Sequence, residues 1–356
     1  MTYLSRLELR SLRNIHSMLL ELSPNINIFV GSNGAGKSTI CEALSLLLHG
    51  RSFRAQAGLR HLLPLGHTEF AINAQFHGSA ITTVKMRRSS VSGWQVTCDD
   101  LAAKQLQTVT KILPLKLLVA EEHSLVDGDP NQRRQFLDWL MFHVEPNYNL
   151  WMRQYQRVLA QRNSALRQKN RFDDELAAWT EQLGQYGDLI ELARIQIVQN
   201  LQIFFKNMPK STYFANISLN LKSNWQGSLA ETLISTRHTE LQRKMTLHGP
   251  HRSDISFNDC KRGLVRHSFS RGEKKIISVL AQLSSVQLLR ELYDKRSLIV
   301  IDDWQSELDR TTQSELFDRL IGPEQQVVLT ATSDLHYGTQ ADSKVFHVEQ
   351  GRLIAK

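Results

Sequence analysis

Residues 26–38 read Ile-Asn-Ile-Phe-Val-Gly-Ser-Asn-Gly-Ala-Gly-Lys-Ser, and this stretch decides the fold of the 356-residue chain. Residues 26–30 predict a short strand and residues 39–48 predict a helix, so the glycine-rich segment joins a strand to a helix. The spacing is G-x-x-x-x-G-K-[ST], whose glycines permit tight turns and close backbone approach. Amide groups at the start of a helix attract phosphates. The pattern therefore predicts a site for a nucleoside triphosphate.

Two side chains of this loop have distinct expected roles. Lys37 would reach the β- and γ-phosphates, and the Ser38 hydroxyl would bind Mg²⁺. The alternative is a glycine-rich turn that merely contains a lysine, and the strand before it and the helix after it disfavour this alternative. The residues predicted to bind the nucleotide are Gly31, Ser32, Asn33, Gly34, Ala35, Gly36, Lys37, Ser38 and Thr39.

Composition places the chain among ordinary globular proteins, with 41% hydrophobic and 22% charged residues. No apolar run is long enough to cross a membrane and the first residues lack a signal-peptide core, so a cytoplasmic location is expected. The three cysteines are far apart, which suggests neither disulfides nor a zinc site. The net charge of +8 favours a polyanionic partner, nucleic acid first, over a merely basic enzyme.

The order of predicted elements indicates an α/β fold with a large insertion. Strands are expected in residues 4–30 and 70–97, and helices from about residue 129 to residue 206. The strands at 297–301 and 326–330 are apolar on both faces, as in a covered parallel sheet. We therefore expect a head formed by residues 1–125 and 246–356, interrupted by a mainly helical lobe at residues 126–245 with the DNA and dimer contacts.

Two carboxylates complete the predicted nucleotide site. Asp302 and Asp303 follow an apolar strand, and ligands bind at the carboxyl ends of such strands. Asp302 would hold Mg²⁺ directly or through water, and Asp303 would act as a base or orient a water, so that Asp303 and Lys37 form the predicted catalytic pair. The alternative is a strand-end turn that happens to contain two acids.

A second anion site is predicted at the start of a helix expected over residues 272–292. Ser270, Arg271, Gly272 and Glu273 lie there and offer hydroxyl and backbone N–H donors. Because Lys37 already accounts for the γ-phosphate, we expect this site to serve a nucleotide on another subunit; alone, the motif indicates only a helix cap. Ser306 and Asp309 belong to an acidic turn that could cross the dimer interface. Thr330 or Thr332 could sense the γ-phosphate, or be plain structure.

These elements in this order resemble the ATPase head of the ABC/SMC superfamily. The resemblance makes the loop a Walker A motif, Ser270 to Glu273 the signature, Asp302 and Asp303 the Walker B end, and Ser306 to Asp309 the D-loop. It implies an ABC/SMC-type P-loop ATPase head with a mixed sheet and an inserted mainly helical lobe.

Within the superfamily the chain closely resembles the RecF family of bacterial recombination mediators over essentially its whole length. The stretches that support this resemblance lie at residues 12–14, 50–54, 128–130, 133–138, 161–163 and 249–252. The resemblance implies ATP and Mg²⁺ as cofactors and an ATP-dependent homodimer with two nucleotides between Walker A of one subunit and the signature of the other. It also implies binding to duplex DNA near single-strand gaps, and cooperation with RecR, and through RecO and RecR the loading of RecA in gap repair and SOS induction.

A basic helix is the predicted DNA contact. No acid occurs in residues 151–172, and i,i+4 spacing places arginines on shared helix faces that could follow a phosphate backbone. The alternative is an ordinary solvated face. The predicted DNA-binding residues are Arg153, Arg157, Arg162, Arg167, Lys169 and Arg171.

The sequence as a whole favours an ATP-switched DNA clamp, in which a slow, DNA-stimulated ATPase serves as a conformational switch. One alternative is an SMC-like chromosome-organising ATPase head, disfavoured because the chain has no heptad array for a long coiled coil. Another is an ABC transporter subunit, which needs a membrane partner and leaves the basic helix unexplained.

Overall fold

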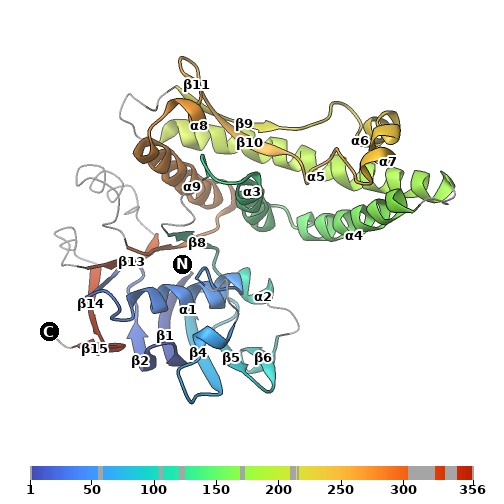
Figure 1. The fold of residues 1–356 in the computed structure, drawn as a ribbon. Coiled ribbons are helices and arrows are strands. Elements are labelled where there is room, and N and C mark those ends of the chain that lie inside the picture. Colours follow the sequence, from blue (N-terminus) through green and yellow to red (C-terminus); the bar gives the residue numbers. More distant parts are fainter. Residues whose placement is uncertain are drawn as a thin grey trace. The chain divides into compact units, whose positions relative to one another are not determined.

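The computed structural model describes residues 2–54, 59–103, 107–119, 125–168, 173–208, 214, 216–303, 325–332 and 343–354. The chain forms two compact units, one of Met1–His123 with Leu289–Lys356 and one of Ser124–Leu288. Each unit is described by itself (Figure 1). None of the helices described could span a membrane.

The first unit contains a six-stranded central sheet in the order β15-β14-β3-β13-β12-β8. Its strands are β3 (Ile26–Val30), β8 (Leu115–Leu118), β12 (Leu298–Ile301), β13 (Gln326–Ala331), β14 (Ser343–Glu349) and β15 (Arg352–Ile354). All neighbours pair in parallel except β14 with β15. Strands β3, β12 and β13 are buried along their whole length, which confirms the predicted covered parallel sheet.

A second sheet of the same unit is antiparallel, in the order β2-β1-β4-β5-β6-β7. It comprises β1 (Tyr3–Leu12), β2 (Ile15–Glu21), β4 (Glu69–His77), β5 (Thr83–Ser89), β6 (Gly93–Cys98) and β7 (Leu101–Ala102). The buried positions of β4 alternate, as expected for a sheet with one covered face. The short helices of the unit are η1 (Leu59–Leu62) and α2 (Gln107–Thr110).

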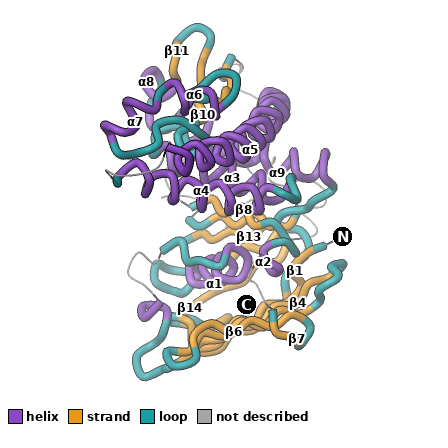
Figure 2. Tube along the Cα trace, turned by 90° about the vertical axis from the view of Figure 1, so that its right-hand side faces the viewer, coloured by secondary structure: helices purple, strands orange, loops and turns teal. Residues whose placement is uncertain are grey.

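Helix α1 (Lys37–His49) lies between these two sheets (Figure 2). Ile40, Leu44 and Leu47 share one hydrophobic core with residues of both sheets. The helix is buried at almost every position from Thr39 to Leu48. Its amino end, with the phosphate loop, is therefore fixed by packing on two sides.

The second unit is mainly helical. Its helices are α3 (Pro130–Val144), α4 (Tyr148–Arg167), α5 (Asp173–Asn207), α6 (Leu229–Ser235), α7 (Arg237–Arg243), α8 (Val265–Ser268) and the greater part of α9 (Arg271–Tyr293). A small antiparallel sheet has the order β11-β10-β9, with β9 (Ile217–Lys222), β10 (Asp254–Asp259) and β11 (Gly263–Leu264). The α/β head and this helical insert confirm the predicted fold class.

The helical unit ends later in the chain than the sequence predicts. We expected the head to resume at residue 246, whereas the second unit extends to Leu288. The reason is strand pairing, because β10 pairs with β9 from Asp254–Lys222 to Asp259–Ile217 and so belongs to the lobe. Ser270 and its neighbours consequently belong to the helical unit.

Candidate nucleotide-binding site

The phosphate loop requires its glycines. Gly34 and Gly36 have φ of 80° and 112°, a left-handed backbone that favours glycine. A Cβ on Gly31 would lie 2.2 Å from the carbonyl oxygen of Val348, so a side chain there would collide with β14. The predicted loop between β3 and α1 is thus formed as the spacing indicates.

The start of α1 offers backbone donors. The first α-helical hydrogen bond runs from the Ile40 N–H to the Gly36 carbonyl, so the amides of Lys37 and Ser38 have no acceptor within the helix. Gly36 at the N-cap has no side chain to cap them. Ser32, Asn33 and Gly34 are exposed at the rim of the loop. The exposed loop at residues 32–34 and the free backbone amides at the start of α1 together form a cradle that suits a phosphate.

Lys37 folds back across the loop and is only 8% exposed. Its Nζ donates to the carbonyl oxygens of Gly31 at 2.7 Å and Ser32 at 2.9 Å. Burial lowers the pKa of Lys37, and the negative charges of Asp302 and Asp303 act in the opposite direction. The ammonium therefore lies in the electrostatic field of both carboxylates, as one nucleotide site requires.

Thr330 holds the Asp302 carboxylate and the backbone of Asp303 at the end of β12. Its hydroxyl donates to Asp302 Oδ1 at 2.7 Å and accepts the N–H of Asp303 at 2.8 Å. Thr330 is 1% exposed. The structure thus favours the structural alternative for Thr330, because its hydroxyl already has both partners. Asp303 has φ of 56°, a conformation that aspartate adopts more readily than most residues.

The residues available to Mg²⁺ are few, and they suit that ion. Among the described residues, no group of three or more His, Cys, Asp or Glu side chains could hold a metal. Ser38 and Asp302 supply one hydroxyl and one carboxylate. Mg²⁺ commonly keeps several waters and takes further oxygens from substrate phosphates, so a sparse set of protein ligands fits it.

Asn14 and Gly351 support the loop from behind, and no motif of the sequence predicts a role for either residue. Asn14 Nδ2 donates to the Gly34 carbonyl at 3.0 Å, and its Oδ1 accepts from the Thr39 hydroxyl at 3.0 Å. The Gly351 N–H donates to the Ala35 carbonyl at 2.7 Å. Gly351 has φ of 75°, and a Cβ there would lie 2.1 Å from the Asn14 carbonyl oxygen. Asn14 lies in the stretch 12–14 that supports the family resemblance, but contacts this distant along the chain leave no local pattern that predicts its role.

The predicted signature forms a capping box at the start of α9. The Ser270 N–H donates to Glu273 Oε2 at 2.7 Å, and the Glu273 N–H donates to Ser270 Oγ at 3.4 Å. Ser270, Arg271 and Gly272 are exposed. A Cβ on Gly272 would meet no atom within 4 Å, so packing among the residues that the structure describes gives no reason for a glycine there.

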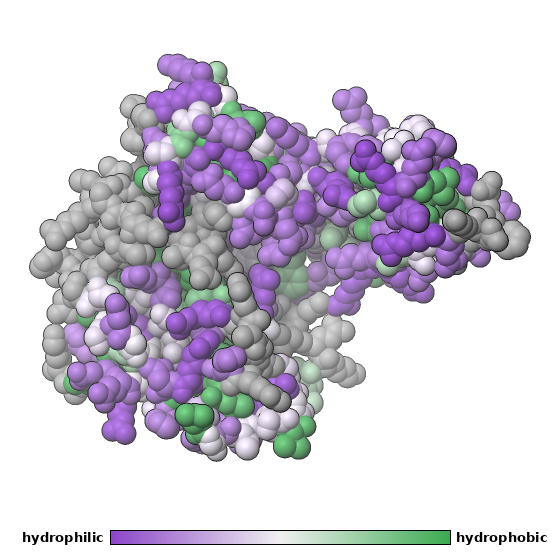
Figure 3. Space-filling model, in the orientation of Figure 1, coloured by the Kyte–Doolittle hydropathy of each residue, from purple (hydrophilic) through white to green (hydrophobic). Residues whose placement is uncertain are grey.

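Part of the predicted arginine face is exposed. Arg153, Arg157 and Arg167 are exposed on α4, and Figure 3 shows the hydrophilic surface of the helical unit. Lys169, Arg171 and the D-loop residues Ser306 and Asp309 lie outside the described residues.

Arg162 is a correction to the predicted DNA-binding set. It is 1% exposed, and its guanidinium donates to Glu240 at 2.6 Å, Thr246 at 2.8 Å and Thr180 at 3.0 Å. The helical period could have revealed this, since Arg162 lies four residues after buried Val158 and seven after buried Tyr155. Arg162 is an internal structural residue.

Comparisons with known proteins agree with this geometry. The family model described as RecF/RecN/SMC N terminal domain matches residues 3–353. The DNA replication and repair protein RecF of Acinetobacter baumannii (strain SDF) is 30% identical over 365 residues, which cover 99% of this chain and 98% of the relative. The protein of the same name from Escherichia coli O1:K1 / APEC is 31% identical over 360 residues, covering 98% and 99%.

The chain belongs to the RecF family. Solved structures agree with this fold assignment. The RecF chain in "Structure of the recombination mediator protein RecF-ATP in RecFOR pathway" matches with a TM-score of 0.83 and 22% identity, covering 99% of this chain and 97% of that one. An Smc head bound to the C-winged helix domain of ScpA matches with a TM-score of 0.56 and 15% identity, covering 99% and 96%. The RecF-family chain therefore has the P-loop ATPase head of the SMC type with a helical insert.

Proposed function

We propose that this RecF-family chain is an ATP-dependent DNA-binding clamp that dimerises when ATP binds. The observation that supports this proposal is the presence of two separate sets of anion-binding groups in one chain. The phosphate loop with Asp302 and Asp303 provides donors and carboxylates for a nucleotide, and the exposed amino end of α9 offers a second set of hydroxyl and backbone N–H donors. A second copy, facing the first, would supply Ser270 and Gly272 to the nucleotide bound by Lys37.

The residues of the loop have separate tasks in this proposal. Bound Mg²⁺-ATP would supply the negative charge and phosphate oxygens that join the two copies. The Lys37 ammonium would exchange its present acceptors, the Gly31 and Ser32 carbonyls, for oxygens of the β- and γ-phosphates. Ser38 and Asp302 would bind the metal. Asp303, whose backbone N–H is fixed by Thr330, would orient and deprotonate a water. Slow hydrolysis would then open the clamp.

Exposed arginines of α4 support the DNA part of the proposal. Arg153 and Arg167 are separated by four turns, about 21 Å along the helix, with Arg157 between them. Side chains so spaced can contact successive phosphates without reading bases. We propose that Arg153, Arg157 and Arg167, with Lys169 and Arg171, bind duplex DNA next to a single-strand gap.

The proposed partners follow from the family. The matched RecF structure is described as part of a RecFOR pathway, and its relatives are named DNA replication and repair proteins. We propose that this chain binds RecR and, with RecO, promotes the loading of RecA in gap repair and the SOS response. An SMC-like chromosome organiser is disfavoured, because α5, with 35 residues, is about 50 Å long, far shorter than an SMC coiled-coil arm.

Sizing by light scattering tests the clamp. With ATP, Mg²⁺ and gapped duplex DNA, the mass of the protein should double from that of a 356-residue monomer, and the DNA should co-elute with the dimer. ADP should leave a monomer. A chain that stays monomeric with ATP and Mg²⁺ and does not bind DNA contradicts the proposal.

A Ser270→Arg substitution should separate ATP binding from dimerisation. Ser270 is exposed, so the larger side chain would cost no more than the N-cap hydrogen bond from the Glu273 N–H, about 1 kcal/mol, and would obstruct an approaching second copy. The Ser270→Arg protein should bind a fluorescent ATP analogue with unchanged affinity at equilibrium. Light scattering should nevertheless detect monomers of this variant in the presence of ATP and Mg²⁺. Ser268→Arg, two residues upstream and also exposed, is the matched control. If Ser270→Arg dimerises normally with ATP, the signature assignment is wrong.

An Arg153→Glu/Arg157→Glu double variant should weaken duplex binding by roughly 10- to 100-fold at about 0.1 M salt. The salt dependence should also flatten, with the log–log slope smaller by about 2, because two phosphate contacts are lost. Fluorescence anisotropy with labelled duplexes measures both quantities. Arg352→Glu, an exposed arginine on β15, is the control. Unchanged duplex affinity at moderate salt would remove α4 from the DNA contact.

A further inference from the structure

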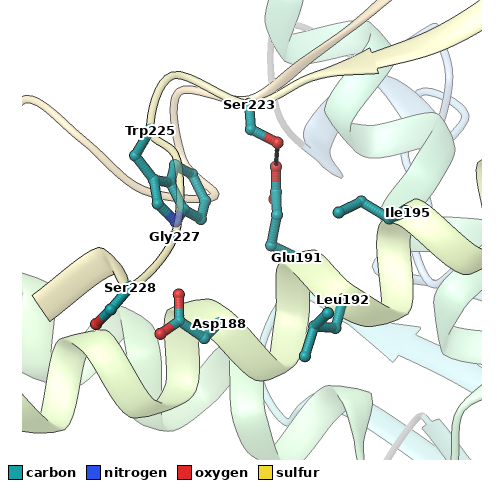
Figure 4. A pocket seen from close by; sticks show the side chains of 8 residues that line it. All are labelled: Asp188, Glu191, Leu192, Ile195, Ser223, Trp225, Gly227 and Ser228. Atoms are coloured by element: carbon teal, nitrogen blue, oxygen red, sulfur yellow. Dashed lines mark hydrogen bonds between the residues drawn. The ribbon is translucent and has the colours of Figure 1, made fainter. Parts of the chain in front are cut away.

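A cavity of about 360 Å³ opens on the helical unit where α5 meets the segment between β9 and α6. Asp188, Glu191, Leu192 and Ile195 line it from α5, and Ser223 and Trp225 line it from the β9–α6 segment. Figure 4 shows the Glu191 carboxylate standing between the Trp225 ring and Ile195, with Asp188 and Leu192 along the helix below. The nucleotide and DNA proposals use none of these side chains.

Glu191 is the unusual member of this group. It is 4% exposed, and its Oε1 accepts hydrogen bonds from the hydroxyls of Ser223 and Ser253, the latter at 2.8 Å. Its other oxygen, Oε2, is buried and has no hydrogen-bond partner among the described residues. A buried carboxylate oxygen without a donor is costly, so a donor from outside the chain would stabilise it.

The other residues that line the cavity indicate what kind of hydrogen-bond donor would fit beside Glu191. Asp188 adds a second carboxylate one turn away, and it already accepts the Leu229 N–H at 3.1 Å. The half-buried Trp225 offers an aromatic ring, to which a cation is attracted. Leu192 and Ile195 are 65% and 37% exposed and form an apolar edge beside the acids. Two acids, one aromatic ring and an apolar edge match a long basic side chain, with its aliphatic stem and charged head.

The charge of the cavity separates it from the DNA contact. Its lining contains two acids and no lysine, arginine or histidine, whereas the chain as a whole has a net charge of +8. Such a cavity repels phosphates, so nucleic acid is not its ligand. Exposed Ile234 of α6 and Leu241 of α7 extend apolar surface on the same helical unit, and apolar side chains gather near these helices in Figure 3.

We propose that this cavity is a docking site for an arginine or lysine side chain, flanked by apolar residues, from a protein partner. The basic head would donate to Glu191 Oε2 and lie against the Trp225 ring, and the flanking residues would cover Leu192 and Ile195. Packing holds the site open, because Gly184 and Gly187 let α6 approach α5 closely; a Cβ on Gly187 would lie 2.3 Å from Leu229. This proposal is independent of ATP binding and dimerisation.

Fluorine NMR on the full chain labelled with 5-fluorotryptophan tests the docking site. The six tryptophans give six signals, and Trp225→Phe assigns the one that matters. The peptide acetyl-Leu-Arg-Leu-amide should shift the Trp225 signal saturably. The same peptide with citrulline, which keeps the shape and lacks the charge, should bind at least about tenfold more weakly. Equal binding of the two peptides, or no saturable shift, overturns the proposal.

Two variants and one free cation complete the test. Glu191→Gln and, separately, Asp188→Asn should each weaken the arginine peptide, while Glu181→Gln, an exposed carboxylate on the same helix, should leave its binding unchanged. A peptide that binds both pocket variants as tightly as the parent protein overturns the site. Spermidine has the charge without the apolar flanks and should bind more weakly than the peptide. Tighter binding of spermidine would overturn the assignment to a protein partner.

Discussion

A Lys37→Ala variant should stay folded and lose ATP-dependent dimerisation. Among the described residues, Lys37 donates only to the Gly31 and Ser32 carbonyls, and burial lowers its pKa, so the protein gains little stability from this charge in the absence of phosphate. In the presence of ATP, the same charge would form hydrogen bonds to phosphate oxygens worth about 1.5–3 kcal/mol. ATP affinity should therefore fall roughly 10- to 150-fold, and light scattering should detect a monomer at an ATP concentration that just suffices to dimerise the parent protein.

The control for this experiment is Lys344→Ala. Lys344 also donates to a backbone carbonyl, that of Glu21 at 3.0 Å, but it is exposed and far along the chain from the loop. This variant should bind ATP and dimerise like the parent protein. If Lys37→Ala dimerises with ATP as the parent does, the loop is not the trigger of the clamp.

An Arg162→Ala variant should lower the free energy of unfolding by about 3–5 kcal/mol, the usual cost of leaving a buried charge without its partner. Glu240 is 0% exposed and pairs with Arg162 at 2.6 Å, and Thr180 and Thr246 would each lose a donor as well. Urea denaturation followed by circular dichroism measures this loss. Arg157→Ala, on the exposed face of the same helix, should change stability by no more than about 0.5 kcal/mol.

A double variant distinguishes the charge from the packing. Arg162→Met with Glu240→Leu removes both charges together and should be much less destabilised than Arg162→Ala, because no unpaired carboxylate remains. If Arg162→Ala instead keeps the full stability of the parent protein and binds duplex DNA more weakly, Arg162 is a DNA-binding residue and its assignment as an internal structural residue is wrong.

Local sequence patterns predicted the main elements of the head, because each of these elements is formed by residues that are neighbours along the chain. The phosphate loop needs glycines at fixed spacing between one strand and one helix. β3 (Ile26–Val30) has the predicted bounds, and α1 (Lys37–His49) contains the helix predicted over residues 39–48 and begins two residues earlier. The strand before Asp302 is apolar throughout because both faces of a parallel sheet are covered. The helix predicted over residues 272–292 is α9, Arg271–Tyr293, since its capping box and its apolar period lie within one segment.

Only the tertiary structure decided which side chains surround the buried Arg162 and which residues support the loop. Arg153 and Arg162 are the same residue type on the same helix. Arg162 is buried because this side of α4 packs against Glu240 and Thr180, whereas Arg153 is exposed on another side of the helix. Asn14 and Gly351 lie in the β1–β2 and β14–β15 turns, far apart in sequence, so no local spacing reveals that both support the loop. Hydrogen bonds and burial depend on distances in space, whereas a motif records only neighbours along the chain. The sequence alone therefore specified the phosphate loop, and the fold specified the residues that support it and left Glu191 Oε2 buried without a hydrogen-bond partner among the described residues.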